Sequence, residues 1–276
     1  MSGLTLVTLP IGNTGDITIR ALDVLRSGIH FYAEDTRVFK DLLRSLGIDY
    51  SQKFIDSYHD QSIGKIDSII QKIKEGEDVF LVSDAGSPII SDPAFPLVKR
   101  VTEEGIKLNS LSGISSVIIA LELSALPPHP FHFWGFMPRT RGEKIENLKK
   151  LKLIQGTHLY FESPHRIFET IETFFEINPD QTLVVARELT KTFQTVTRLD
   201  KNNLNEVKTL IKDKGEFVIL FHQDVVKNQI YPDELVELVN DYISSGGGTK
   251  KLSKIFSKIS GEDAKSLYDR LNRSDK

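Results

Sequence analysis

The sequence contains no cysteine among its 276 residues. This excludes a disulfide framework and any metal or redox site that depends on a thiolate. Long hydrophobic runs are also missing, since no stretch approaches the roughly 20 apolar residues that span a bilayer. The segment 1–10 has neither a basic start nor a long apolar core, so we expect no signal peptide, no membrane association and a cytoplasmic location.

A strong excess of charge of one sign is lacking too, because the formal net charge is only −3. The overall charge therefore does not by itself indicate nucleic-acid binding. Two segments nevertheless carry a local balance of +4: residues 139–152, with six Lys or Arg and two Asp or Glu, and residues 244–276, with eight and four. Local patches of this kind can bind phosphates, although solvated helix faces explain each patch equally well.

With 39% hydrophobic and 26% charged residues, the chain has the composition of a globular protein long enough for two domains. Apolar runs typical of strands alternate with helical patterns, which predicts α/β architecture with a mostly parallel sheet. The expected strands are 4–9, 29–33, 78–82, 107–111, 131–136, 158–161, 182–186 and 217–221. The expected helices are 18–26 (or from Asp16), 38–46, 63–74, 95–104, 143–151, 167–175 and 204–212.

Three prolines between residues 127 and 130 interrupt this alternation and predict a linker. We therefore expect an α/β domain at 1–125, a second at 126–225 and a helical module at 226–276. The module combines an acidic helix at 233–243, a triple glycine at 246–248 and two basic helices at 250–259 and 262–271. In the first basic helix, the lysines are predicted to bind phosphates: Lys250, Lys251, Lys254 and Lys258. The apolar residues are predicted to form the opposite, buried face of that helix: Leu252, Ile255, Phe256 and Ile259.

Ligands of open α/β sheets bind beyond the carboxyl ends of the strands, so the residues after each expected strand are candidate site residues. The loop 10–16 is rich in glycine, but it matches neither a dinucleotide-binding nor a phosphate-binding fingerprint. The loops 34–37 and 112–116 contain good helix caps, which explain them as well as a ligand does. The long loop 83–93 is rigid and favours a functional role, and 162–166 and 187–191 each combine a carboxylate with a cation.

Six strings in register resemble the tetrapyrrole-methylase-like class of methyltransferases and, within it, the ribosomal RNA small subunit methyltransferase I family. They lie at 10–18, 33–37, 83–93, 161–166, 186–191 and 215–216, so the resemblance spans nearly the whole chain. Two departures occur. The family has Pro-Gly-Pro where this chain has Ser112-Gly113-Ile114, and it favours Pro-Gly after the aspartate where this chain has Asp92-Pro93-Ala94.

The resemblance implies a fold of two α/β domains with a cofactor cleft between them, plus a small helical RNA-binding module. It implies S-adenosylmethionine as cofactor and the 2′-hydroxyl of a cytidine in the decoding region of 16S rRNA as methyl acceptor. It also implies 16S rRNA or the small ribosomal subunit as partner, and a homodimer. The cofactor contacts it implies are Leu9, Pro10, Asp84, Ser87, Ile90, Ser115, Ser116, Ser163 and Leu189.

Methyl transfer from a sulfonium needs no metal, so we expect none, but the ribose hydroxyl must lose its proton. The candidate bases are Glu34, Asp35 and a neutral Lys191. Ion pairs with Arg37 or Lys191 would equally explain the two carboxylates. The residues expected to hold RNA are Arg37, Arg139, Arg141, Arg166, Lys250 and Lys254.

Two other functions fit the same features. One is a small-molecule methylase of the same fold, for example one acting on tetrapyrroles. The other is a non-catalytic RNA-binding or ribosome-assembly protein. The basic segment 139–152 and the C-terminal module disfavour a small substrate, and binding of S-adenosylmethionine would disfavour a non-catalytic role.

Overall fold

The computed structural model describes residues 2–59, 62–90, 94–224, 239, 241–243, 245–260 and 263–273. The chain divides into two compact units. The first comprises Met1–Lys149 and Gly156–Gln223, and the second comprises Lys150–Gln155 and Asp224–Lys276. The first unit contains both sheets and the second contains the C-terminal helices.

The N-terminal sheet has five parallel strands in the order β3-β2-β4-β1-β5. Their bounds are β1 (Gly3–Val7), β2 (His30–Ala33), β3 (Phe54–Ser57), β4 (Val79–Val82) and β5 (Lys107–Leu111). The prediction of a parallel sheet is confirmed, and so are four of the predicted strands, β1, β2, β4 and β5. The edge strand β3 was not predicted, because none of its four residues is buried and its sequence shows no apolar alternation.

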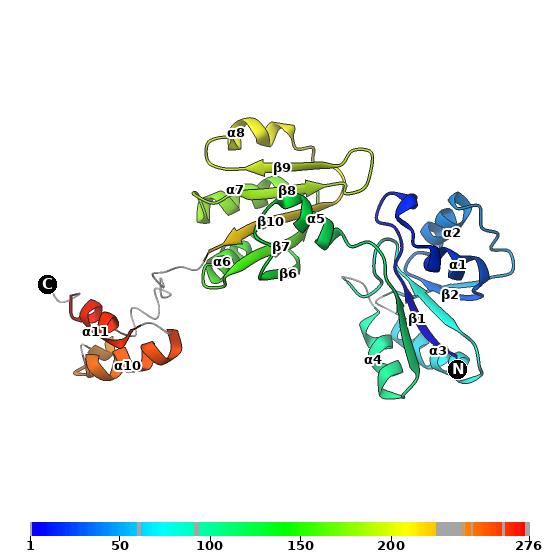
Figure 1. Cartoon of the computed structure of the whole chain (residues 1–276), viewed down its shortest axis with the longest axis horizontal. Helices are drawn as coiled ribbons and strands as arrows, with labels where there is room; N and C mark the ends of the chain where they lie inside the picture. The colour runs from blue at the N-terminus through cyan, green and yellow to red at the C-terminus, as the bar shows by residue number, and fades with distance from the viewer. Residues whose placement is uncertain are drawn as a thin grey trace. The chain divides into compact units, whose positions relative to one another are not determined.

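Helices cover both faces of this sheet (Figure 1). On one face, α1 (Ile19–Ser27) and α2 (Thr36–Ser45) contribute Leu25 and Phe39 to a buried core with Phe31. On the other, α3 (Ile66–Lys74) and α4 (Phe95–Glu103) contribute Ile69 and Leu97. Burial on both faces explains why the central strands are continuous apolar runs.

The second sheet has the order β6-β7-β10-β8-β9. The strands are β6 (Phe131–Phe136), β7 (Gly156–Glu162), β8 (Leu183–Arg187), β9 (Thr195–Leu199) and β10 (Phe217–Gln223). β6 and β7 are parallel, but β10 is antiparallel to both of its neighbours and β9 is antiparallel to β8. The expectation of a mostly parallel sheet is therefore wrong here. A short loop joins β8 to the unpredicted β9, and such a connection produces an antiparallel pair.

The helices that accompany the second sheet are α5 (Ser116–Ser124), α6 (Arg141–Leu151), α7 (Ile167–Ile177) and the short α8 (Leu204–Val207). A 3-10 turn at Lys208–Leu210 replaces the second half of the helix expected at 204–212. α5 precedes the proline segment, yet its Val117 and Leu121 share a core with Leu159 and Val184 of the second sheet. The chain therefore begins to pack against the second sheet before it reaches the prolines. The boundaries of the three predicted domains stay predictions.

In the second unit, α10 (Thr249–Ser260) and α11 (Ala264–Arg273) pack against each other. Lys250, Lys251 and Lys254 are exposed, as expected. The predicted apolar face is wrong at Ile255, which is 46% exposed, because Ser253 occupies the buried position instead. Most of the helix expected at 233–243 lies outside the described residues. Within the part of the chain that is described, no helix combines the length and apolar character needed to cross a membrane.

Candidate active site

Two loops at the carboxyl ends of β1 and β4 are joined by backbone hydrogen bonds. Leu9 N–H donates to the Gly86 carbonyl at 2.9 Å, and Gly86 N–H donates back to the Leu9 carbonyl at 3.1 Å. The left-handed backbone of Gly86, with φ of +72°, shapes the turn that makes this pairing possible. Leu9 is a buried core residue and Pro10 is half-buried. The loops after β1 and β4, both predicted to hold the cofactor, are therefore paired with each other through their backbones.

Three carboxylates gather where β2 and β4 end; we call Glu34, Asp35 and Asp84 the acidic cluster. The Asp84 carboxylate accepts the Asp35 backbone N–H at 2.9 Å, and Asp84 N–H donates to Glu34 Oε2 at 3.4 Å. A small hollow of about 10 Å³ beside the cluster is lined by Glu34, Tyr58 and neighbouring residues of the β4 loop. Tyr58 follows the unpredicted β3, so the sequence offered no sign that it belongs to this region.

The members of the acidic cluster differ in their electrostatics. Asp35 caps α2 by accepting the Arg37 N–H at 2.8 Å, and its other oxygen lies 2.6 Å from the Arg37 guanidinium. The side-chain and backbone hydrogen bonds from Arg37 lower the pKa of Asp35 to about 2. Burial raises the pKa of Asp84, against the opposing effect of the Asp35 N–H. Asp84 is therefore the better proton acceptor of the two at neutral pH.

The β8–β9 loop holds Lys191 between two carboxylates. Its ammonium lies 3.0 Å from Glu188 Oε1 and 3.0 Å from Glu216 Oε2. Partial burial lowers the pKa of Lys191, but the hydrogen bonds to Glu188 and Glu216 outweigh it, so that the pKa is raised. These contacts favour the charged ammonium over the neutral amine that a general base requires.

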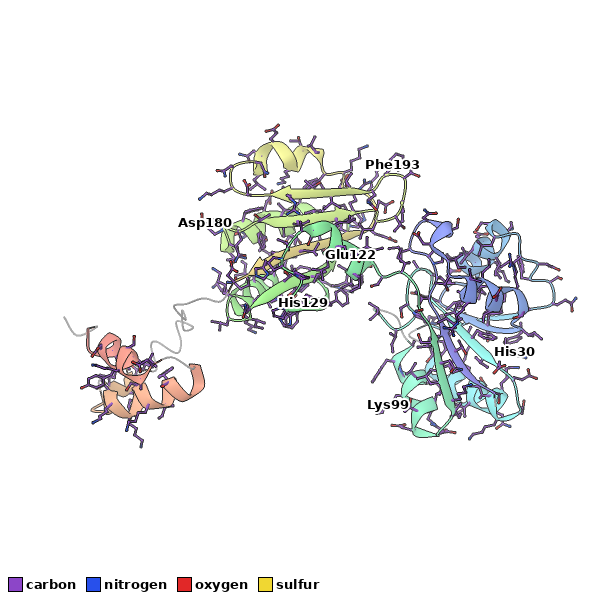
Figure 2. All side chains as sticks on the ribbon, viewed as in Figure 1. His30, Lys99, Glu122, His129, Asp180 and Phe193 are labelled. Carbon is purple, nitrogen blue, oxygen red and sulfur yellow. The ribbon has the colours of Figure 1, made fainter. Side chains whose placement is uncertain are left out.

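The same loop is conformationally strained and firmly held. Glu188 and Thr190 have φ of +51° and +64°, which is unusual for residues other than glycine. Thr190 Oγ1 accepts the Asn13 N–H at 3.1 Å, and a Cβ on Gly12 would lie 2.4 Å from Lys191 Cγ. The glycine loop after β1 therefore contacts the Lys191 loop directly. Phe193 projects from this loop and is 70% exposed (Figure 2).

The serines before α5 are not explained by helix capping alone. Ser115 occupies the N-cap position, but among the described residues its side chain makes no capping hydrogen bond. A Cβ on Gly113, just before these serines, would lie 2.7 Å from Thr8 Cγ2, so only glycine fits there. Ser115, Ser116 and Ser87 are half-buried and Ile90 is exposed, whereas 91–93 lie outside the described residues.

The cations predicted to bind RNA fall into different environments. Arg37 and Arg139 are exposed, and Arg141 forms an exposed ion pair with Glu176. Arg166 is only 21% exposed and pairs with the buried Glu162, next to the half-buried Ser163. Lys144 is fully buried, so the basic segment 139–152 presents less surface charge than its sequence suggests. Leu189, a predicted cofactor residue, is also buried.

No group of three His, Asp or Glu side chains in the described ranges is arranged to hold a metal ion. The candidate site comprises the acidic cluster, the Lys191 ammonium and the half-buried serines. These features come from both sheets of the first unit.

Comparison with known proteins identifies the family. The family model of Tetrapyrrole (Corrin/Porphyrin) Methylases matches residues 3–205. Ribosomal RNA small subunit methyltransferase I of Hydrogenobaculum sp. (strain Y04AAS1) is 38% identical over 233 residues, which cover 84% of this chain and 99% of the relative. The protein of the same name from Bacillus subtilis (strain 168) is 36% identical over 263 residues, with 92% and 88% covered.

Solved structures agree on the fold. Diphthine synthase matches with a TM-score of 0.62 at 17% identity, over 80% of this chain and 89% of that structure. The methyltransferase CobJ matches with a TM-score of 0.60 at 14% identity, over 84% and 98%. The predicted α/β methylase fold, with a parallel sheet and a second sheet, is thereby confirmed. The chain belongs to the tetrapyrrole methylase family and, within it, to the ribosomal RNA small subunit methyltransferase I family, and it is a methyltransferase.

Proposed function

We propose that the protein transfers a methyl group from S-adenosylmethionine to the ribose 2′-hydroxyl of a cytidine in the decoding region of 16S rRNA. The observation that carries this proposal is the position of the glycine loop after β1. This loop bonds to the Gly86 loop of the first sheet and, through Asn13, to the Lys191 loop of the second. A cofactor held in a cleft between the two α/β domains would contact loops of this kind.

The residues present fit S-adenosylmethionine. Ser115 offers a hydroxyl that is not used as a cap, beside the unpaired N–H groups of a helix N-terminus. The residues that would hold the cofactor are Pro10, Asp84, Ser87, Ile90, Ser115, Ser116 and Ser163, with the buried Leu9 and Leu189 behind them. When bound, the cofactor supplies a methyl group that its sulfonium charge makes electrophilic, so no metal is needed.

The protein's own residues supply proton transfer and orientation. We assign acceptance of the 2′-hydroxyl proton to the acidic cluster, in which Glu34 and Asp84 are better suited than Asp35 because the pKa of Asp35 is about 2. The charged Lys191 contributes a fixed positive potential. Arg37, Arg139 and Arg141, with Lys250 and Lys254 of the helical module, would meet RNA phosphates.

A small-molecule methylase is the second candidate, because CobJ and other methylases share the fold. The exposed lysines of α10 favour the RNA substrate instead. The family resemblance further leads us to propose a homodimer located in the cytoplasm.

The test uses purified protein, radiolabelled S-adenosylmethionine and small ribosomal subunits or free 16S rRNA from cells that lack the protein. We expect label in the RNA, mapped to a cytidine 2′-oxygen, and no loss of activity in a chelator once the RNA fold is shown to be intact. Cofactor binding without RNA labelling would favour a small substrate. Absence of cofactor binding would favour a non-catalytic RNA-binding protein.

A further inference from the structure

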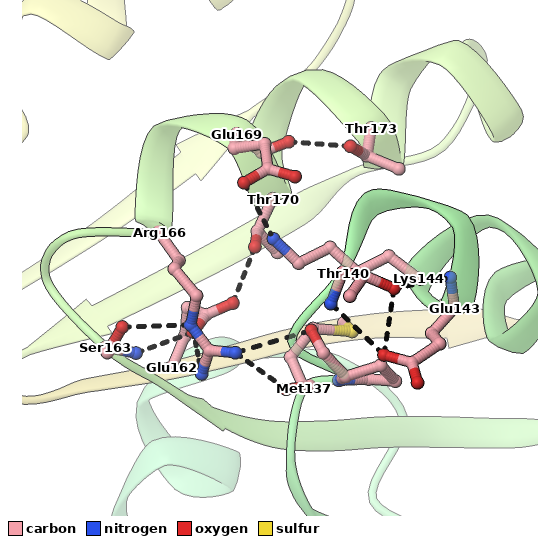
Figure 3. A network of polar contacts seen from close by, with 11 residues as sticks. Met137, Thr140, Glu143, Lys144, Glu162, Ser163, Arg166, Glu169, Thr170 and Thr173 are labelled. Carbon is pink, nitrogen blue, oxygen red and sulfur yellow. Dashed lines mark hydrogen bonds and ion pairs between the residues drawn. The ribbon is translucent and has the colours of Figure 1, made fainter.

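A buried carboxylate stands at the end of β7. The side chain of Glu162 is fully buried, and both of its oxygens accept hydrogen bonds (Figure 3). Oε1 accepts the Ser163 N–H at 2.7 Å and pairs with the Arg166 guanidinium at 2.8 Å, while Oε2 accepts the Thr170 hydroxyl at 2.5 Å. A buried charge is tolerated only with such full satisfaction, so Glu162 is held in one orientation.

Arg166 carries these contacts onward to the neighbouring loop. Its Nε donates to Ser163 Oγ at 3.0 Å, and its Nη1 reaches the carbonyls of Met137 and Pro138 at 3.4 and 3.5 Å. The guanidinium has five N–H donors in a rigid plane, and all three of its nitrogens already face protein acceptors. Arg166 therefore connects the turn after β6 with the turn after β7.

A second link joins the helices that follow these turns. Lys144 of α6 is fully buried, and its Nζ lies 3.5 Å from Glu169 Oε2 of α7 (Figure 3). Within the described residues, this ammonium makes no hydrogen bond. The start of α6 and the start of α7 are therefore tied together at two points, although the contacts at Arg166 are the more numerous.

We propose that Arg166 and Glu162 are positioning residues that orient Ser163 toward the cofactor, rather than contacts for RNA phosphates. The inference rests on the proposed function, in which Ser163 faces S-adenosylmethionine. Because Ser163 Oγ accepts from Arg166 Nε, its own O–H is left to donate. The ligand group that Ser163 binds is therefore a hydrogen-bond acceptor, such as a ring nitrogen or a carboxylate oxygen.

The test compares Arg166→Lys with Arg166→Gln in the full-length protein and uses Arg44→Gln, at an exposed ion pair with Asp41, as the matched control. A lysine keeps a positive charge beside Glu162 but cannot bridge the Ser163 hydroxyl and the two carbonyls. We expect both Arg166 variants to raise the Kd for S-adenosylmethionine about tenfold, as for loss of one hydrogen bond to a charged group. Arg44→Gln should leave this Kd unchanged. The salt dependence of RNA binding should be the same in wild type and Arg166→Lys.

A second variant guards against simple misfolding, because removal of a partner from Glu162 also destabilises the fold. Ser163→Ala leaves the Glu162–Arg166 pair intact, and it should raise the same Kd without lowering the melting temperature. The double variant with Arg166→Lys should then bind the cofactor no worse than either single variant.

Additive increases in Kd in the double variant, or Arg166 variants that bind the cofactor like wild type, would overturn the inference. So would an Arg166→Gln variant whose only defect is an RNA-binding salt slope reduced by about 1, the signature of a phosphate contact. If the wild-type protein itself does not bind S-adenosylmethionine, the proposed function fails, and this inference fails with it.

Discussion

At the scale of single residues, the proton affinity of each carboxylate in the acidic cluster depends on the hydrogen bonds and ion pairs that it forms. Asp35 is neutralised by Arg37, whereas Asp84 accepts the backbone N–H of Asp35. Their pKa values consequently move in opposite directions, Asp35 to about 2 and Asp84 upward. Carboxylates whose environments separate their pKa values in this way are suited to different roles in one site.

The lowered pKa of Asp35 predicts a specific pH dependence of stability. Its pKa falls from 3.8 to about 2 on folding, so its ionised form stabilises the protein at pH values above 3.8. That contribution is lost as the pH falls through about 2. Asp35→Asn, which keeps the helix cap, should therefore lower the free energy of unfolding at neutral pH but not in strong acid. Denaturant titrations of both proteins over this pH range measure the difference.

Arg37→Gln provides the control for this prediction. It removes the guanidinium that lowers the pKa but keeps the backbone N–H of residue 37, so it should change the pH dependence of stability in the same direction as Asp35→Asn and by a smaller amount. A stability difference between wild type and Asp35→Asn that stays constant from neutral pH into strong acid would contradict the assignment.

Lys191 and Asp35 are expected to act in turnover more than in cofactor binding. Lys191→Ala removes the cation between Glu188 and Glu216, and Asp35→Ala removes a member of the acidic cluster. We expect single-turnover methylation to fall by about 100-fold, within the range of groups that act only in the transition state, with little change in the Kd for the cofactor. Lys201→Ala, at an exposed ion pair with Asp180, is the control. Normal turnover in both variants would refute these roles.

At the scale of elements, α6 contains a lysine in an unfavourable environment. Lys144 is fully buried without a hydrogen bond among the described residues, and its partner Glu169 is partly exposed. Replacement of a whole buried ion pair by apolar side chains is often neutral or stabilising, whereas removal of one partner is costly when the other charge stays buried. The Glu169 side chain is 43% exposed, so its charge can be solvated without Lys144. Lys144 is therefore expected to contribute little to the free energy of unfolding.

We expect Lys144→Met to leave the melting temperature unchanged or to raise it by a few degrees. About 1 kcal/mol corresponds to roughly 2–4 °C in a protein of 150–250 residues. Lys149→Met, at an exposed position of the same helix, is the control for added hydrophobicity. Thermal unfolding measures both variants. A clear drop in the melting temperature for Lys144→Met alone would show that the contact with Glu169 stabilises the junction of α6 and α7.

At the scale of the whole molecule, the family fold ends before the helical module begins. The family model matches residues 3–205, while α10 starts at Thr249. The match to the Bacillus subtilis relative covers 92% of this chain, whereas the match to the Hydrogenobaculum relative covers 84% of this chain and 99% of that relative. A module added to a methylase fold is consistent with a macromolecular substrate.

We expect the module to supply RNA affinity and not chemistry. Lys250→Gln combined with Lys254→Gln should weaken binding to the small subunit and reduce the salt slope by about 2, because each lysine is expected to neutralise one phosphate. Cofactor affinity should not change, because the cofactor residues all precede Glu216. The charge-matched control combines Lys99→Gln in α4 with Lys107→Gln in β5, since both lysines are exposed.

Truncation before Gly246 extends this prediction. The shortened protein should bind S-adenosylmethionine normally and bind RNA with a flatter salt dependence. A truncated protein that unfolds or no longer binds the cofactor, without a separable RNA defect, would show that α10 and α11 are a structural cap instead.

The sequence by itself determined the features that depend on neighbouring residues. Apolar runs predicted β1, β2, β4 and β5, and Thr18 and Gly28 marked the ends of α1, since capping is local. The strings of small and polar residues after these strands were sufficient to identify the family. β3 and β9 were not predicted. Both are edge strands that bury little apolar surface, so their sequences show only a weak hydrophobic pattern.

Only the tertiary structure decided which of these residues are partnered. The sequence pattern indicated that Arg166 and Lys144 are surface cations. Contacts with β7 leave Arg166 only half-buried, and α7 helps to bury Lys144 fully. Lys191 read as a candidate base, but Glu216, 25 residues away, helps to keep it charged. The hydrogen bond from Asn13 to Thr190 spans 177 residues. Burial, pairing and pKa depend on groups that are distant in the chain, and no local pattern specifies which distant groups will meet.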